Sequence, residues 1–264
     1  MKFKYSIGSI TDIKKLYEQK FYLPFRNNGD FRKTKRDLIS YQKKYYISLM
    51  EEAKTGKVYA YNISRQRNEK LITMYESNII SNFYNEKALF KLLIFCLKRI
   101  LDDGYSETII DIPANSFLDL YRFSFFNSEV VGLDFTRFWS TYGSKIPILT
   151  IRIRLSEDIK KASLIPFKKL ENYFYLVQKC HKNLNEKYVV NCGSFYILRK
   201  TCDQKVETII EEADQICKFC KMKKAIIGIP STKLLLLGFC LIGKMSPVGY
   251  VANFYDNESY ILLS

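Results

Sequence analysis

Residues 109–113, Ile-Ile-Asp-Ile-Pro, recur in altered form as Ile-Ile-Gly-Ile-Pro at residues 226–230. The offset between the two stretches is 117 residues. At the same offset, Val131-Gly132 recurs as Val248-Gly249, so both matches share one register without a gap. A shared register over two separate stretches indicates that the chain contains two related copies of one unit.

A third match lies upstream and shows that the copies differ in length. Residues 12–15, Asp-Ile-Lys-Lys, recur at 158–161 with an offset of 146, which gives the first copy 29 more residues in its front half. The polar segment 140–144 and the following Pro147 are typical of a join between domains. We therefore expect two tandem domains, at residues 1–145 and 146–264.

The segment before each of the two Ile-Ile stretches has the apolar spacing of a helix that packs on a core. In the first copy these positions are Leu89, Leu92, Leu93, Cys96 and Ile100. Their counterparts 117 residues later are all apolar: Val206, Ile209, Ile210, Ala213 and Cys217. Each copy is thus expected to run helix, short turn, apolar strand, second apolar helix and strand, the order of helical crossovers between parallel strands.

Alternating apolar and polar residues predict the remaining strands. Residues 147–155 alternate with period two and are followed by Ser156, a good N-cap residue, so we expect a strand and helix that open the second copy. A strand at 3–10 and a helix at 11–21 are expected to open the first copy. Further strands are predicted at 57–64, 70–77, 188–190 and 194–198.

Composition bounds the class of protein. A chain of 264 residues with 47% hydrophobic content has enough apolar residues for two ordinary cores. No apolar run approaches the ~20 residues of a membrane-spanning helix, and the N-terminus lacks the apolar core of a signal peptide. Seven cysteines in a chain of this size are typical of reduced thiols. A cytoplasmic protein is expected.

The charge is strongly basic and concentrated at the front. The formal net charge is +15, of which residues 1–70 contribute +10. Tyr41, Tyr45 and Tyr46 alternate with cations there, a pattern that predicts a helix facing nucleic acid, with stacking rings between phosphate-binding side chains. The alternative is a solvated basic face in a chain of Lys-rich composition. The candidate nucleic-acid-binding residues are Arg32, Lys33, Lys35, Arg36, Lys43 and Lys44.

The expected order of elements resembles the GNAT superfamily of acyltransferases. Residues 155–159 (LSEDI) resemble its opening strand-to-helix step, and residues 108–112 (TIIDI) followed by 120–126 (LYRFSFF) resemble its late strand and helix. The resemblance implies an α/β (α+β) fold of two tandem GNAT-like domains, each a mixed, mostly antiparallel sheet flanked by helices. It implies transfer of an acyl group to an amine.

The resemblance also implies catalytic residues. Tyr121 matches the helix tyrosine that acts as general acid toward the departing thiolate in the family, although a buried packing tyrosine would have the same pattern. Because the chain has a single histidine, a base at neutral pH would be a carboxylate or an ordered water. Glu76, beside the strand that leads into the central helix, is the best-placed carboxylate, with an ordinary exposed strand residue as the alternative.

The cofactor loop is where the chain departs from the family. The resemblance implies that Asn85, Glu86 and Lys87, at the start of the central helix, bind the cofactor. The family has glycines there, whose bare N–H groups meet the pyrophosphate of coenzyme A. This chain has Tyr84 and Glu86 at those positions, and Asp203 in the second copy. A ring and carboxylates disfavour conventional binding of acetyl-CoA by crowding and like-charge repulsion.

Three functions remain open. In the first, the protein is an acyltransferase that binds acyl-CoA atypically, or an aminoacyl-tRNA-dependent transferase resembling the Fem type. In the second, both domains are degenerate and bind RNA or a protein partner. In the third, the second copy is structural and only the first acts on a small amine or peptide. No metal site is expected, because Cys217 and Cys220 lack a second pair at zinc-finger distance.

Overall fold

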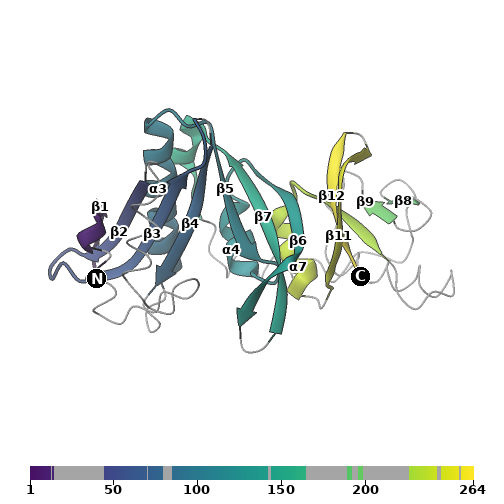
Figure 1. Ribbon diagram of the computed structural model, residues 1–264, viewed down its shortest axis with the longest axis horizontal. Helices are drawn as coiled ribbons and strands as arrows, with labels where there is room; N and C mark the ends of the chain where they lie inside the picture. Colours follow the sequence, from purple (N-terminus) through teal and green to yellow (C-terminus); the bar gives the residue numbers. More distant parts are fainter. Residues whose placement is uncertain are drawn as a thin grey trace. The chain divides into compact units, whose positions relative to one another are not determined.

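The computed structural model describes residues 1–12, 14, 45–69, 71–79, 85–141, 144–164, 189–191, 196–198, 226–242, 245–255 and 257–264 (Figure 1). The described helices are α3 (Glu86–Asp102), α4 (Phe117–Phe123), the 3₁₀ helix η1 (Glu157–Lys161) and α7 (Leu234–Ile242). The described strands of the first half are β1 (Phe3–Ile7), β2 (Tyr45–Glu52), β3 (Val58–Gln66), β4 (Leu71–Ile79), β5 (Glu107–Pro113), β6 (Ser128–Thr141) and β7 (Ser144–Arg154). Those of the second half are β8 (Val189–Asn191), β9 (Tyr196–Leu198), β10 (Ile227–Pro230), β11 (Pro247–Tyr255) and β12 (Glu258–Leu263).

The chain forms two compact units. Unit 1 comprises Met1–Ile110 and Arg154–Ala162, and unit 2 comprises Asp111–Ile153 and Ser163–Ser264. The first four residues of strand β5 belong to unit 1 and its last three to unit 2. Each unit is described by itself.

Unit 1 is a mixed sheet covered by a long helix. Its strands follow the order β1-β2-β3-β4-β5. The first three neighbouring pairs are antiparallel, whereas β4 and β5 are parallel and are connected by helix α3. A parallel pair needs such a crossover because a short hairpin cannot return the chain to the same end of the sheet.

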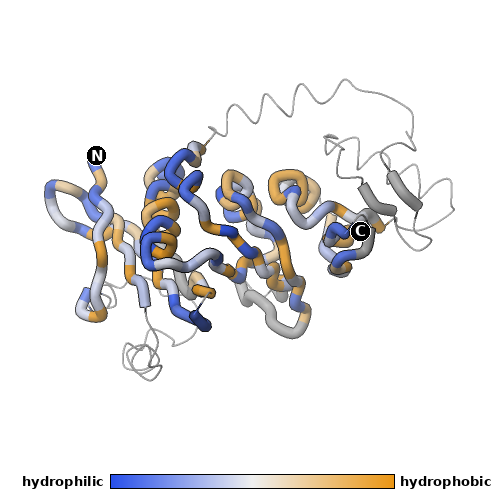
Figure 2. Tube along the Cα trace, turned by 90° about the horizontal axis from the view of Figure 1, so that it is seen from above, coloured by the Kyte–Doolittle hydropathy of each residue, from blue (hydrophilic) through white to orange (hydrophobic). Residues whose placement is uncertain are grey.

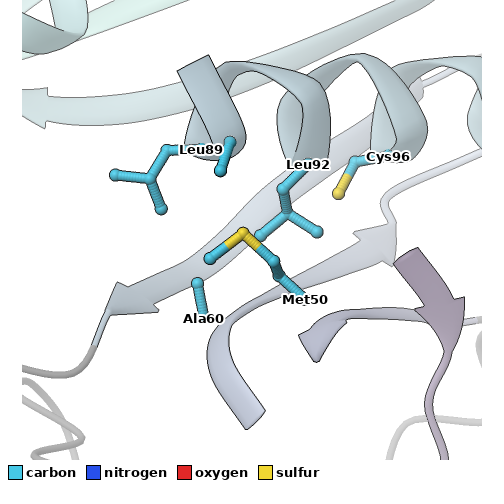
Figure 3. Packing of buried hydrophobic residues seen from close by; sticks show 6 residues of the cluster. Met50, Ala60, Leu89, Leu92 and Cys96 are labelled. Atoms are coloured by element: carbon cyan, nitrogen blue, oxygen red, sulfur yellow. The ribbon is translucent and has the colours of Figure 1, made fainter. Parts of the chain in front are cut away.

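Helix α3 forms where the apolar spacing predicts it. Its buried positions include all five residues of the predicted stripe, together with Ala88, Phe90 and Leu97. Leu89, Leu92 and Cys96 lie over Met50 and Ala60, which face one another across β2 and β3 (Figure 3). Burying one leucine of this kind stabilises the fold by about 1.5–3 kcal/mol. The stripe therefore fixes which face of α3 meets the sheet.

The end of α3 is held by polar contacts with β2. The hydroxyl of Tyr46 donates a hydrogen bond to the carboxylate of Asp103, the C-cap residue of the helix. Gly104 follows with a φ of 89°, a left-handed conformation that favours glycine. The ring of Tyr46 also meets the ring of Tyr105 edge to face, with 6.3 Å between centroids. These contacts join the first residues of β2 to the last turn of α3.

Unit 2 contains the β5-β7-β6 strands and a second sheet. Strands β6 and β7 form a long antiparallel hairpin with two register shifts. The N–H of Ala114 donates to the carbonyl of Pro147 at 2.8 Å, and in unit 1 the N–H of Leu155 donates to the carbonyl of Ser106 at 2.8 Å. The first bond joins the residue after the end of β5 to the first half of β7, and the second joins the residue after the end of β7 to the residue before β5. β5 and β7 therefore run antiparallel.

The second sheet has the order β11-β12-β10-β9-β8. The pairs β11–β12, β10–β12 and β8–β9 are antiparallel, and β9–β10 is parallel. Hydrophobic and hydrophilic residues alternate along many of the described strands, as Figure 2 shows. Among the residues of helix α7, Leu234, Leu237 and Cys240 are buried.

Several sequence predictions are confirmed within the described residues. The mixed α+β architecture is present, and the central helix is α3. The predicted strands at 57–64, 70–77, 188–190 and 194–198 correspond to β3, β4, β8 and β9. No described helix is long and apolar enough to cross a membrane.

The strand predicted at 147–155 exists. It is β7, and its partner is β6, from Ser128 paired with Ile153 to Thr141 paired with Ser144. The segment after it is a short 3₁₀ helix, and Ser156 makes no side-chain capping bond to it. Period-two alternation identifies a strand but not its partner. The predicted boundary at residue 145 lies inside β7, and the division into two domains remains a prediction.

Candidate functional site

The three residues predicted to bind a cofactor come together at the N-terminus of α3. Asn85 is the N-cap, and its side-chain oxygen accepts a hydrogen bond of 3.0 Å from the N–H of Ala88. Its backbone carbonyl accepts from the N–H of Leu89, also at 3.0 Å. Glu86 supplies a carboxylate in the first turn, and Lys87 is exposed. A side-chain cap and an acid in the first turn are the usual means of stabilising a helix start.

The same contacts change what this helix end can bind. An anion at a helix N-terminus uses the first N–H groups and the positive end of the helix dipole. Here Asn85 already accepts from the Ala88 N–H, and the Glu86 carboxylate lies in the same turn. A pyrophosphate would have to displace the Asn85 amide and approach a like charge. The hydroxyl of Tyr5 donates to the carbonyl of Ala88 at 3.1 Å, which ties this turn to β1.

Strand β4 precedes this helix in the chain, and only its first part pairs with both β3 and β5. Its parallel pairing with β5 extends from Leu71 with Glu107 to Met74 with Ile110. Pairing with β3 continues to the end of β4, where Ala60 faces Ile79. The last five residues of β4 therefore have β3 on one edge and no registered β5 partner on the other. Such an edge presents backbone donors and acceptors to an extended ligand that carries amide groups.

Glu76, the candidate base, lies in this last part of β4. It occupies the register position opposite Ile63. The structure describes its backbone only. Glu76 lies within β4, the strand that precedes the central helix, and its catalytic role stays a prediction.

Tyr121, the candidate acid, lies on α4 in unit 2. Its side chain is 1% exposed. The ring stacks on Phe117 with 6.0 Å between centroids and an interplanar angle of 13°, and meets Phe125 edge to face at 5.2 Å. The Oγ of Ser124 donates to the backbone carbonyl of Tyr121 at 2.7 Å. These contacts fix the orientation of the ring. A fixed orientation is required of a packing residue and equally of a positioned acid.

The predicted nucleic-acid-binding cations lie outside the described residues, from Arg32 to Lys44. Two of the interleaved tyrosines are described. Tyr45 and Tyr46 begin strand β2 rather than continuing a basic helix. Tyr46 is 5% exposed and its hydroxyl contacts Asp103, so its ring does not offer a stacking surface for bases. That part of the prediction is wrong for Tyr46, because the segment is a strand in which this ring is buried.

Polar side chains on β5, β7 and β6 contact one another, and the sequence analysis did not identify them as a group. The hydroxyl of Thr150 donates to the Asp111 carboxylate at 2.7 Å. The Nη2 and Nε of Arg152 both donate to Oε1 of Glu129, at 2.6 and 3.1 Å. The alternation of residues 147–155 predicts this polar face, but not its carboxylate partners on two other strands.

No three described His, Cys, Asp or Glu side chains come close enough together to hold a metal ion. Cys217, Cys220 and His181 lie outside the described residues.

Comparison with solved structures finds N-acetyltransferases. The ribosomal-protein-S18-alanine N-acetyltransferase from Escherichia coli matches with a TM-score of 0.49 and 11% identity, over 59% of this chain and 95% of that chain. A spermidine/spermine N-acetyltransferase from Vibrio cholerae matches with a TM-score of 0.49 and 8% identity, over 61% of this chain and 100% of that chain. A GNAT superfamily phosphinothricin acetyltransferase from Sinorhizobium meliloti, in complex with acetyl-CoA, matches with a TM-score of 0.48 and 13% identity, over 60% of this chain and 90% of that chain.

Sequence comparisons give no match. No family model matches the chain, and no curated protein matches it in sequence. The chain is thus similar in structure to N-acetyltransferases over about 60% of its length.

Proposed function

We propose that the protein is a GNAT-like acyltransferase that moves an acyl or aminoacyl group onto an amine, with its donor bound along β4 and the start of α3. The observation that carries the proposal is the end of the β4–β5 pairing at Met74 while β4 continues to Ile79. A strand edge of five residues without a registered β5 partner can pair with the amides of an extended arm. The pantetheine arm of an acyl thioester is a ligand of this kind.

The capped start of α3 limits the choice of donor. The Asn85 cap and the Glu86 carboxylate disfavour a pyrophosphate at this helix end. The donor is therefore either an acyl-CoA whose pyrophosphate lies away from the helix N-terminus, or an aminoacyl-tRNA, whose ester needs no pyrophosphate site. The acceptor class is a small amine or peptide.

The reaction needs two proton transfers. The acceptor nitrogen forms a bond to the acyl carbon and loses a proton, for which Glu76 is the proposed base. The carbon–sulfur bond of a thioester donor then breaks, and the departing thiolate takes a proton from the proposed acid, the Tyr121 hydroxyl. With an aminoacyl-tRNA donor, the leaving group is the ribose oxygen instead.

We also propose that the chain is an internal duplication. Two features support it. The strand order β3-β4-β5-β7-β6 has the same succession of antiparallel and parallel pairs as β8-β9-β10-β12-β11. The turn after each Ile-Pro is also alike, with Ser116 N–H donating to Pro113 O and Lys233 N–H donating to Pro230 O, both at 2.9 Å. On this correspondence we propose that β7 belongs to the first copy and that the junction follows Leu155, rather than residue 145.

A second candidate function is a degenerate binding module for RNA or a protein partner. The net charge of +15 favours an RNA partner, because cations attract phosphates regardless of sequence. In that case neither Glu76 nor Tyr121 would act on a substrate.

Titration of the purified chain with acetyl-CoA and with bulk tRNA, each at 50 and 200 mM salt, tests the proposal. Saturable, weakly salt-dependent binding of acetyl-CoA supports the thioester donor. Binding of tRNA that weakens steeply with salt, without binding of acetyl-CoA, supports an aminoacyl-tRNA donor or the RNA module. Acyl transfer from charged tRNA to an amine would distinguish those two. Binding of neither ligand contradicts the acyltransferase proposal.

A further inference from the structure

Helices α4 and α7 occupy corresponding places in the two proposed copies. Each follows an Ile-Pro turn, and the offset of 117 residues pairs Phe117 with Leu234 as the first residue of each helix. The same offset pairs Tyr121 with Gly238. The second copy therefore has no phenol where the first has its candidate acid.

The two helices pack against each other (Figure 1). Gly238 lies at their contact. A Cβ at position 238 would lie 3.0 Å from Cδ2 and 3.4 Å from Cε2 of Phe117, and 3.5 Å from Cβ of Leu120. A distance of 3.0 Å is well inside the usual contact of 3.5–4.0 Å between carbon atoms. Glycine thus allows α7 to approach the ring of Phe117.

The contact extends to other corresponding elements. Strand β6 contacts β11, its counterpart, and the N–H of Val130 on β6 donates to the carbonyl of Ser231 at 2.9 Å. Contacts of one element with its own counterpart are what a two-fold symmetric interface produces. The contacts of α4 with α7 and of β6 with β11, all within unit 2, are therefore of the kind that two identical subunits make across a two-fold axis.

A line of contacts runs from Gly238 to Tyr121. Gly238 meets one edge of the Phe117 ring, and Phe117 stacks on Tyr121 with nearly parallel rings. Both aromatic residues lie on α4, one turn apart, and Leu120 between them is fully buried. Any shift of the Phe117 ring therefore changes the surface on which Tyr121 rests.

We propose that α7 of the second copy packs on Phe117 and thereby fixes the position of Tyr121. The second copy has Gly238 at the position that corresponds to this candidate acid. Gly238 and Phe117 are positioning residues in this account. The inference deepens the proposed function and rests on it for the role of Tyr121. The packing of α7, Phe117 and Tyr121 can be tested without a substrate.

The test uses the full chain labelled with 3-fluorotyrosine and observed by fluorine NMR. The Tyr121 resonance is assigned by its loss in Tyr121→Phe. We compare Gly238→Ala with the matched control Gly132→Ala, whose Cβ would meet Thr150 Cβ at an ordinary 3.7 Å. Gly132 and Gly238 lie in the same unit. The combined variant Gly238→Ala with Phe117→Leu removes the ring with which the new Cβ collides.

We expect Gly238→Ala to shift the Tyr121 resonance by more than its linewidth, and Gly132→Ala to leave it in place. If Gly238→Ala does not fold, Phe117→Leu is expected to restore folding. A folded Gly238→Ala chain with an unchanged Tyr121 resonance would overturn the proposal, and so would a combined variant that stays unfolded. These outcomes do not depend on activity, so failure of the acid role of Tyr121 would appear separately, as unchanged turnover in Tyr121→Phe, and failure of the acyltransferase proposal as binding of neither acetyl-CoA nor tRNA.

Discussion

The guanidinium of Arg99 on α3 donates a hydrogen bond of 2.6 Å to the backbone carbonyl of Ile47 on β2. The same Nη1 atom donates to the Ser48 hydroxyl at 3.0 Å, and the guanidinium carbon lies 5.5 Å from the centroid of the Tyr46 ring. A single cation thus contacts three successive residues of β2. It joins the helix that begins at the candidate site to a central part of the sheet in unit 1.

Replacing Arg99 tests how much this contact contributes to the free energy of unfolding. Arg99→Met keeps the apolar stem but leaves the carbonyl of Ile47 without its charged donor. We expect the free energy of unfolding to fall by about 1.5–3 kcal/mol in urea denaturation, the range for a hydrogen bond to a charged group. Lys98→Met, at the exposed neighbouring position, removes the same charge and should change stability by less than about 0.5 kcal/mol. Equal effects of the two substitutions would mean that charge alone, not the contact, matters.

The cap of α3 gives a second prediction. Asn85→Ala removes the acceptor for the Ala88 N–H and should lower the free energy of unfolding by about 1 kcal/mol, whereas Asn85→Asp should preserve most of it. Thermal and urea unfolding measure both. If Asn85→Ala is as stable as the natural chain, Asn85 does not occupy the helix N-terminus as described.

Two buried thiols predict alkaline destabilisation. Burial raises the pKa of the Cys96 thiol and that of Cys240 to about 12, whereas a cysteine in the unfolded chain ionises near about 8.5. Above that pH the unfolded state has lost protons that the folded state keeps, so stability is fully present below about pH 8.5 and falls as pH rises. Each thiol contributes a slope of about 1.4 kcal/mol per pH unit.

Urea unfolding between pH 8.5 and 10 measures this slope. Cys96→Ala should make the decline shallower by roughly one thiol's share, about 1.4 kcal/mol per pH unit, whatever its effect on stability at pH 7. A parallel decline in the natural chain and in Cys96→Ala would show that Cys96 ionises alike in both states.

Tyr121→Phe separates the two roles of this ring. It keeps the stacking on Phe117 and removes only the hydroxyl, so the fold should be retained. With an identified donor and acceptor, loss of a general acid should lower kcat by about 10²–10⁴-fold. Unchanged turnover would assign Tyr121 to packing alone.

The sequence predicts the parts of the fold in which one element carries its own signal. The stripe from Leu89 to Ile100 identifies α3 because helical spacing depends only on residues within the helix. Strand β7 shows the limit of such signals. Its alternation predicts a strand, but β6 is chosen as its partner by a long antiparallel register that leaves no local trace.

The candidate site was predictable to a similar degree. The glycine-free start of α3 is visible in the sequence, since Asn85 and Glu86 can be read directly. The end of β4–β5 pairing at Met74 is not, because it depends on where two distant strands separate. The Gly238 contact also required coordinates, since only the distance to Phe117 shows why glycine stands at that position.

The central claim is that the donor pairs with the edge of β4 and that the start of α3 does not bind a pyrophosphate. Calorimetric titration with acetyl-CoA and with S-acetylpantetheine, which lacks the nucleotide and the pyrophosphate, tests it most directly. The account predicts saturable binding of both with similar Kd, within about threefold, because less than about 1 kcal/mol would come from the pyrophosphate. Acetyl-CoA binding at least 100-fold tighter than S-acetylpantetheine would contradict it, whereas no binding of either thioester would exclude the thioester donor and leave only the aminoacyl-tRNA donor.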